Sequence, residues 1–371
     1  AQAITQNKIA GDGSTVGEVK YDILVVTVTW KVAGQPTNVD YDYGATPVYT
    51  GTPTMSSTEY FEYSFANWDK EIVAATEDVT YEALFDIKLL KDITVTFEDS
   101  IYIDNLNTVL DLNGKTLTVN MTLTTSGANC SFIDNLYGTI CNGKIVVNYV
   151  ATSENGSHRS VLVNNLNGGL IKDVEIDAVV TSLDNNALKG IISNDNSIGT
   201  LENVVIKARR TNNVETLGVF RRASKDITLK NCIILTDSIG LTAGGYSGLT
   251  SETLDKFTAI NCSHYNPITT VEQLKQISGK AGNLYILQND LVVPSSDTSE
   301  SIIVNLASTL DLNGYTITRE ATSSKFFING ITENGVLKNG KIVITYDGDI
   351  NGNQGFLIDG NDGLVENVEV A

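Results

Sequence analysis

One segment recurs along the chain at intervals of 28 to 31 residues: an apolar stretch, an Asn or Asp, and another apolar stretch. A second feature, an apolar residue that is followed two positions later by a pair of Asn or Asp residues, recurs at 132–135, 162–165 and 192–195, which is a spacing of 30 residues. Because two separate features share one period, the whole unit repeats rather than a single motif. The Asn or Asp of the first feature stands at Asn113, Asn142, Asp173, Asn203, Asn231 and Asn261.

The repeated segments predict short β-strands, since their apolar residues alternate and Asn, Asp or Gly interrupts them every few residues. Several strands per repeat with no long helix between them indicate the coils of a solenoid, stacked into parallel sheets. We therefore predict an all-β chain built around a parallel β-helix. Coils of about thirty residues with three faces resemble those of known right-handed β-helices, and the resemblance implies that hand.

The Asn or Asp that returns once per coil has a physical role in this fold. Asn tolerates the left-handed bend of a corner, and amide groups stacked in successive coils can hydrogen-bond along the solenoid. The sequence therefore predicts a structural ladder at these positions, which continues at Asn313, Asn339 and Asn367.

The repeat restarts near residue 270. The segment 310–318 nearly copies 110–118, and Thr270-Val271-Glu272-Gln273 fits a capping box that starts a short helix with Leu274, Ile277 and Gly279. We expect one β-helix over 88–266 and a second, incomplete one over 267–371 that begins with this capping helix. A solenoid ending at Ala371 leaves an open strand edge, so we expect further chain, a partner or self-association at that edge.

Residues 21–87 lack the period and predict a small β module, preceded by a flexible lead over 1–20. Strands are expected at 21–32, 60–68 and 79–85, with turns around Tyr43-Gly44-Ala45-Thr46-Pro47 and Gly51-Thr52-Pro53-Thr54. The run from Val28-Thr29-Trp30 through Tyr63-Ser64-Phe65-Ala66-Asn67-Trp68 to Val79-Thr80-Tyr81-Glu82-Ala83-Leu84-Phe85 resembles the Listeria–Bacteroides, or internalin B-type, repeat of Gram-positive surface proteins. Asn67 departs from that family, which usually has Gly before the Trp. The resemblance, with β-helix blocks such as Leu110–Thr116, implies an extracellular, multi-domain bacterial surface protein.

Charge and composition exclude several classes of protein. The chain has 44 acidic and 25 basic residues and a net charge of −19, whereas nucleic-acid binding needs a basic surface. No apolar run is long enough for a direct membrane span. Four cysteines in 371 residues are too few for a disulfide-based scaffold.

Polysaccharide lyases and glycoside hydrolases also occur on β-helices, but the fold alone does not establish an activity. Asp173, Glu175 and Asp177 alternate on one strand, which predicts a solvated outer face, with a metal or catalytic site as the alternative. No carboxylate pair of the kind that hydrolases use stands out. We predict no catalytic residues.

Two further groups of residues are candidates for binding. Arginines cluster in sequence at Arg209, Arg210, Arg221 and Arg222, with Arg159 earlier, which suggests either a grip for an acidic glycan or local charge balance. Asp347, Asp349 and Asn351 match the first half of a Ca²⁺ loop, but Ile358 stands where that loop needs an acid. We therefore expect no cofactor, with Ca²⁺ as the alternative.

The cysteines and aromatic residues are expected to be structural. Cys232 and Cys262 align with inward positions and predict buried thiols, with a disulfide between adjacent coils as the alternative. Trp30, Trp68, Tyr43 and Tyr63 predict the core of the small module rather than a sugar platform.

The preferred function is a non-enzymatic extracellular adhesin or structural stalk on the cell surface, whose partner is a host or bacterial glycan or protein. The first alternative is a glycan-binding or polysaccharide-degrading protein. The second is a phage tail or head fibre, located on the virion surface.

Overall fold

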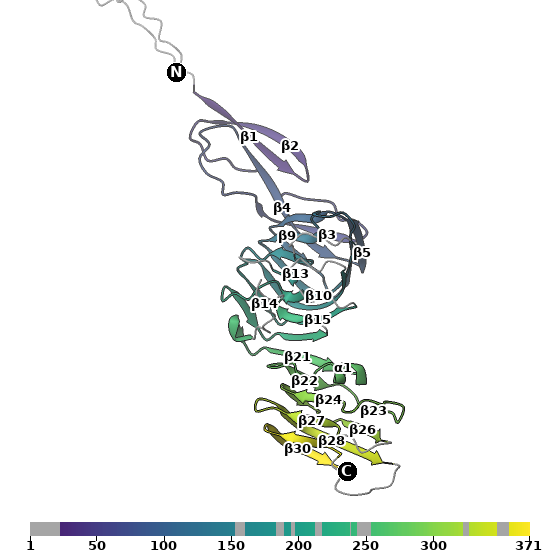
Figure 1. Cartoon of the computed structure of the whole chain (residues 1–371). Helices are drawn as coiled ribbons and strands as arrows, with labels where there is room; N and C mark the ends of the chain where they lie inside the picture. Colours follow the sequence, from purple (N-terminus) through teal and green to yellow (C-terminus); the bar gives the residue numbers. More distant parts are fainter. Residues whose placement is uncertain are drawn as a thin grey trace, which may run out of the picture. The chain divides into compact units, whose positions relative to one another are not determined.

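A computed structural model describes residues 23–152, 160–182, 189–193, 197–211, 217–237, 239–242, 254–321, 326–346 and 356–371 (Figure 1). The chain is 58% strand and 3% helix and forms a β-solenoid of about eight turns, which confirms the predicted all-β parallel β-helix. It divides into two compact units. The first contains residues up to Ser56 together with Tyr63–Asp86, and the second contains Ser57–Glu62 and Ile87–Ala371.

The first unit is built on a hairpin. Strands β1 (Val25–Val32) and β2 (Gln35–Asp42) pair antiparallel, and the turn between them places Ala33 and Gly34 at φ values of 47° and 79°. Strand β1 also pairs parallel with β4 (Val79–Leu89), and β4 pairs with β3 (Phe61–Trp68). The strands expected at 60–68 and 79–85 are confirmed, whereas β2 was not predicted.

Trp30 forms the centre of this unit. Its side chain is 1% exposed, and its ring lies 4.7 Å from that of Trp68 and 5.1 Å from that of Tyr81. The prediction of a buried aromatic core is therefore confirmed for Trp30, and Trp68 is partly buried against it. The prediction is wrong for Tyr43, which is 52% exposed because it follows β2 in a turn completed by Gly44.

The second unit begins with a stretch of stacked coils in which parallel strands form two sheets. The larger sheet contains the end of β4, β5 (Ile93–Glu98), β7 (Val109–Asp111), β8 (Thr116–Leu123), β10 (Thr139–Ala151), β12 (Leu170–Ser182), β14 (Gly199–Glu202), β15 (Val205–Arg210), β17 (Ile227–Lys230), β18 (Ile233–Asp237), β20 (Thr258–Ile260) and β21 (Ser263–Ile268). The smaller contains β6 (Ile101–Leu106), β9 (Ser131–Leu136), β11 (Val163–Asn165), β13 (Lys189–Ile192), β16 (Leu217–Phe220) and β19 (Gly240–Thr242). A 3-10 turn, η1, spans Leu254–Lys256.

The stacking places the same apolar position of each coil above the last. Ile145, Ile176, Ile206 and Ile234 are partners in successive strands, and all four are fully buried. Burying branched side chains in such columns removes apolar surface from water on every coil. The repeat period seen in the sequence is thus the length of one coil.

The coils that follow continue the parallel pairing but have a buried cluster of their own. They contain α1 (Val271–Lys275), β22 (Leu284–Leu287), β23 (Leu291–Val293), β24 (Ile303–Leu306), β25 (Thr309–Asp311), β26 (Thr316–Ala321), β27 (Ile328–Ile331), β28 (Val336–Tyr346), β29 (Ile358–Asn361) and β30 (Leu364–Val370). One cluster extends from Leu89 to Phe257, and the other from Ile268 to Ile342.

The predicted capping box at Thr270 is confirmed. The Thr270 hydroxyl accepts from the Gln273 backbone N–H at 3.2 Å, and the Gln273 side chain accepts from the Thr270 backbone N–H at 3.2 Å. Leu274 and Ile277 are buried in the second cluster. The short helix therefore places its apolar side chains over the start of the second core.

Candidate functional site

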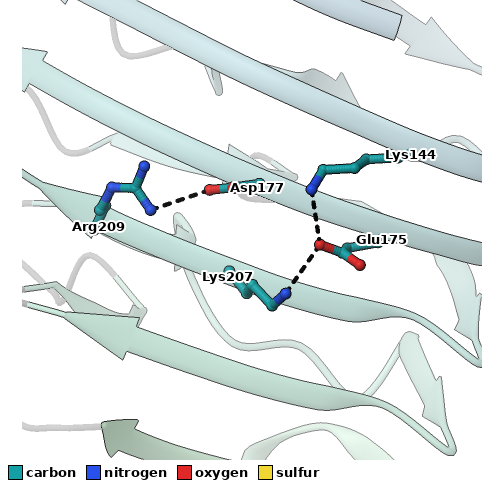
Figure 2. A network of polar contacts seen from close by, with 5 residues as sticks. All are labelled: Lys144, Glu175, Asp177, Lys207 and Arg209. Atoms are coloured by element: carbon teal, nitrogen blue, oxygen red, sulfur yellow. Dashed lines mark hydrogen bonds and ion pairs between the residues drawn. The ribbon is translucent and has the colours of Figure 1, made fainter. Parts of the chain in front are cut away.

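Rows of opposite charge lie on the outward positions of β10, β12 and β15 (Figure 2). Val174 and Ile176 are buried, so the alternating Glu175 and Asp177 point away from the core, as predicted for an outer face. In the register of the sheet, Glu175 lies beside Lys144, and Asp177 lies beside Lys207.

Glu175 is shared between two lysines from the coils on either side. Its Oε1 accepts from Lys144 Nζ at 3.0 Å and from Lys207 Nζ at 2.9 Å. The hydrogen bond from Lys207, followed by that from Lys144, lowers the pKa of Glu175. These three side chains are 36–47% exposed, so solvent screens the pairs and each contributes little stability by itself. The carboxylate joins three coils.

Asp177 makes a second contact between coils. Its Oδ1 lies 3.3 Å from Arg209 Nη1 in the next strand, and the Asp177 side chain is 23% exposed. In β18, which pairs with the other side of β15, Asp237 is the register partner of Arg209. Arg209 is therefore placed between acidic residues of the two neighbouring coils, which agrees with local charge balance.

The arginine cluster of the sequence is not one open surface. Arg209 is exposed on the outer face, but Arg221 is only 7% exposed because it follows the buried residues Val219 and Phe220 of β16. Arg210 and Arg222 are partly buried, and each interacts with other groups of the chain. Arg159 lies outside the described residues. A grip made by all of these guanidinium groups on one ligand does not follow from this arrangement.

The repeated Asn and Asp residues stand at corners of the coils. Every predicted ladder residue has a φ between 50° and 59°, the left-handed region that Asn adopts more readily than most residues. Asn203 Nδ2 donates to Asp173 Oδ1 at 2.7 Å, Asn231 Nδ2 to Asn203 Oδ1 at 3.0 Å, and Asn261 Nδ2 to Asn231 Oδ1 at 3.4 Å. Asp173 is thus the first acceptor of a ladder. It is exposed, as predicted for the outer face, but it stands at the left-handed corner that precedes the alternating residues Glu175 and Asp177.

At the start of each β-helix, the side chains of successive ladder asparagines do not bind each other. Asn142 donates to Asp111 Oδ1 at 3.1 Å instead of to Asn113, and Asn339 donates to both carboxylate oxygens of Asp311, at 3.2 and 3.1 Å. Asn113 and Asn313 donate to the backbone carbonyls of Leu89 and Leu287. Asn367 then donates to Asn339 Oδ1 at 3.4 Å.

A local insertion explains this difference. The corner from Asp111 to Thr116 holds four residues between its strand positions, whereas the matching corner from Cys141 to Lys144 holds two. The inserted Leu112 is fully buried and presses against the next coil, where a Cβ on Gly143 would lie 2.6 Å from Leu112 Cβ. The second β-helix repeats this arrangement, since a Cβ on Gly340 would lie 2.3 Å from Leu312 Cβ.

His264 is a partly buried histidine near the start of the second cluster. Thr236 Oγ1 lies 2.9 Å from its Nε2 and also donates to Asn266 Oδ1 at 3.0 Å. Burial lowers the pKa of His264 to about 4. The ring is therefore neutral at pH 7 and belongs to a polar layer between stacked coils.

A groove of about 450 Å³ lies beside the smaller sheet of the second β-helix. In the first β-helix, Asn105, Asn135 and Asn165 are register partners, and Asn165 Nδ2 donates to Asn135 Oδ1 at 3.1 Å. The corresponding partners in the second β-helix are Asn305, Gly330 and Gly360, so two side chains are missing there. Within the described part of the chain, the side chains of Asn305, Glu333 and Asp362 at this groove have no hydrogen bond or ion pair.

The residues of the expected Ca²⁺ loop, Asp347, Asp349 and Asn351, lie outside the described residues. Among the described residues, no group of three or more His, Cys, Asp or Glu side chains is arranged to hold a metal ion. Within the same ranges, no helix has the length and apolar character needed to cross a membrane.

The basic partners of Glu175 and Asp177 were not predicted from the sequence, although their spacing along the chain indicates them. Lys144 precedes Glu175 by 31 residues, and Lys207 and Arg209 follow Glu175 and Asp177 by 32. Opposite charges separated by one coil length become neighbours when parallel strands stack in register.

Comparisons with known proteins found no similar protein in which these sites could be compared. No family model matches the chain, and neither the curated proteins nor the solved structures contain a match.

Proposed function

We propose that this chain is a non-enzymatic stalk or adhesin on an extracellular cell surface, built on stacked β-helix coils. The observation that carries the proposal is the position of Glu175 between Lys144 and Lys207. The carboxylate that a β-helix enzyme could use for catalysis is occupied in joining three coils.

The other acidic groups on this face support the same conclusion. Asp177 pairs with Arg209, and Asp173 accepts from Asn203. Chemically capable side chains thus serve coil-to-coil contacts, in keeping with a molecule selected for regular stacking. The resemblance of the first unit to surface-protein repeats supports the extracellular location.

The groove at Asn305, Glu333 and Asp362 is the first surface to test for adhesive contacts. Among the described residues, the side chains of Asn305, Glu333 and Asp362 make no polar contacts between coils, in contrast to Glu175 and Asp177. Amide, hydroxyl and carboxylate groups can accept or donate hydrogen bonds to the hydroxyl groups of a glycan.

Location is tested with antibodies raised against the purified chain and applied to intact cells that make the protein. We expect labelling of intact cells that is removed by brief protease treatment of their surface. Labelling only after permeabilisation would contradict the proposal, and labelling of phage particles alone would favour the fibre alternative.

Adhesion is tested by measuring binding to arrays of glycans and to immobilised surface proteins. We expect the E333Q/D362N variant to lose at least half of the binding and the E175Q/D177N variant to retain it. The second variant is a matched control, because it removes two carboxylates from the coil-joining face. Equal binding by wild type and both variants would contradict the assignment of the groove.

A further inference from the structure

Cys232 and Cys262 occupy the same position in two consecutive coils. Each directly follows a ladder asparagine, and the next residues, Ile233 and Ser263, are register partners of β18 and β21. The backbone N–H of Cys232 donates to Cys262 Sγ at 3.4 Å. The two thiols are therefore neighbours although 30 residues separate them in sequence.

The surroundings of the two sulfur atoms differ. Cys232 is fully buried, at the corner position that Val174 and Val204 fill in the preceding coils, whereas Cys262 is partly exposed. Burial first, and the neighbouring Cys262 in addition, raise the pKa of the Cys232 thiol to about 11. Cys262 is consequently the sulfur that a reagent in solution reaches.

We propose that Cys232 and Cys262 are a redox pair that closes into a disulfide joining two successive coils. Stacked strands lie about 4.8 Å apart. That separation falls within the Cα range of about 4.4–6.8 Å that disulfides span. The described structure is the reduced form of the pair, in which both cysteines are free.

Closure proceeds by exchange with a small disulfide such as oxidised glutathione. The Cys262 thiolate attacks one sulfur of the reagent, forms a mixed disulfide and releases one thiolate. The Cys232 thiolate then attacks the Cys262 sulfur and releases the second. The two cysteines lose two electrons and two protons, and the reagent becomes two thiols.

The remaining cysteines provide internal controls. Cys141 is a register partner of Asp111 on one side and of Lys172 on the other, so neither adjacent coil offers it a thiol. Cys130 is buried, and its Sγ lies 3.7 Å from the carbonyl of Thr122. These two cysteines remain thiols in the oxidised protein.

The position of the pair gives the disulfide a structural role. Cys232 belongs to the first buried cluster and Cys262 packs against it, in the last coils before Ile268, where the second cluster begins. A bond between coils at this place closes a loop of about thirty residues and restricts the unfolded chain. Oxidation would thus stabilise the last coils of the first buried cluster.

The test uses the full chain incubated with oxidised glutathione at pH values from about 7 to 9. We expect the number of thiols measured after unfolding to fall from four to two, and peptide mapping without reduction to link the Cys232 and Cys262 peptides. The rate should increase with pH because the attacking groups are thiolates. The melting temperature should rise by about 5–10 °C and return to the starting value on reduction.

Two variants make the result specific. C130A/C141A should lose both of its remaining thiols on oxidation, and C262A should form no intramolecular link. Retention of four thiols by the folded wild-type protein throughout this pH range would overturn the proposal. A link that involves Cys130 or Cys141, or a link between two molecules, would overturn it equally.

Discussion

Asn203 Nδ2 donates to Asp173 Oδ1 in the preceding coil at 2.7 Å, and both residues have a φ of 55°. One residue thus performs two tasks. It adopts the left-handed corner that turns the coil, and it binds the equivalent residue of its neighbour. The same combination at Asn231 and Asn261 explains why the sequence repeats Asn or Asp more strictly than it repeats the apolar residues between them.

Substitution of Asn231 separates these two tasks. N231A should reduce the free energy of unfolding by about 2–3 kcal/mol, because alanine loses the amide contacts and is strained at positive φ. N231G should lose about 1 kcal/mol less, because glycine tolerates this φ but cannot bind either neighbour. The measurement is the urea midpoint and slope of each variant. Equal losses would contradict the double role.

Replacement of Glu175 tests whether its carboxylate is structural. E175Q should reduce the free energy of unfolding by less than about 1 kcal/mol, because the pairs with Lys144 and Lys207 are partly exposed. The loss should become smaller in high salt, which screens the same pairs in the wild type. If Glu175 were instead a catalytic carboxylate without stabilising partners, its replacement would leave the free energy of unfolding unchanged or raise it. Urea titrations at low and high salt distinguish the two outcomes.

His264 should make the protein sensitive to mild acid. Its pKa is about 4 in the folded chain, below the ordinary value near 6.5, so the unfolded state binds more protons between these values. Stability is fully present above about pH 6.5 and is lost progressively as the pH falls toward 4, by up to about 3 kcal/mol.

The His264 contribution is isolated by comparing two variants across this pH window. H264Q should flatten the dependence of the urea midpoint on pH between about 4 and 6.5, whereas H158Q, which removes the chain's other histidine, should retain it. A slope that persists in H264Q and disappears in H158Q would show that the proton binds elsewhere.

Gly143 should be required because Leu112 occupies the space that a side chain would need. G143A should destabilise the protein by about 1–3 kcal/mol through overpacking against Leu112 Cβ and the Lys115 carbonyl. The cost should be smaller in an L112G background, which removes the Leu112 Cβ, and a double-mutant cycle measures this coupling. Additive losses would contradict the contact.

Much of the fold could be predicted from the sequence because each coil repeats the same physical requirement. Asn at a left-handed corner and branched residues in buried columns recur at one period, so the stacking follows from spacing alone. The corner at Leu112 could not be predicted in this way. A two-residue insertion leaves the spacing from Asn113 to Asn142 near one period, but the Asn142 side chain donates to Asp111 instead of to Asn113.

Other features depend on contacts that the repeat does not encode. Strand β2 (Gln35–Asp42) was missed because its mostly exposed, polar residues lack an alternating apolar pattern, and β1 supplies its pairing. The arginines were grouped because they are close in sequence. Arg221 is nevertheless buried directly after β16, while Arg209 is on the outer face.

The central claim is that carboxylates on the outer face join coils rather than act on a substrate. The most direct test incubates the purified chain with acidic and neutral polysaccharides, with and without Ca²⁺, and measures unsaturated products and new reducing ends. We predict no product above that of a heat-unfolded control, together with the loss of stability in E175Q described above. Sustained product release that disappears in E175Q or D177N, with stability unchanged in that variant, would contradict the claim.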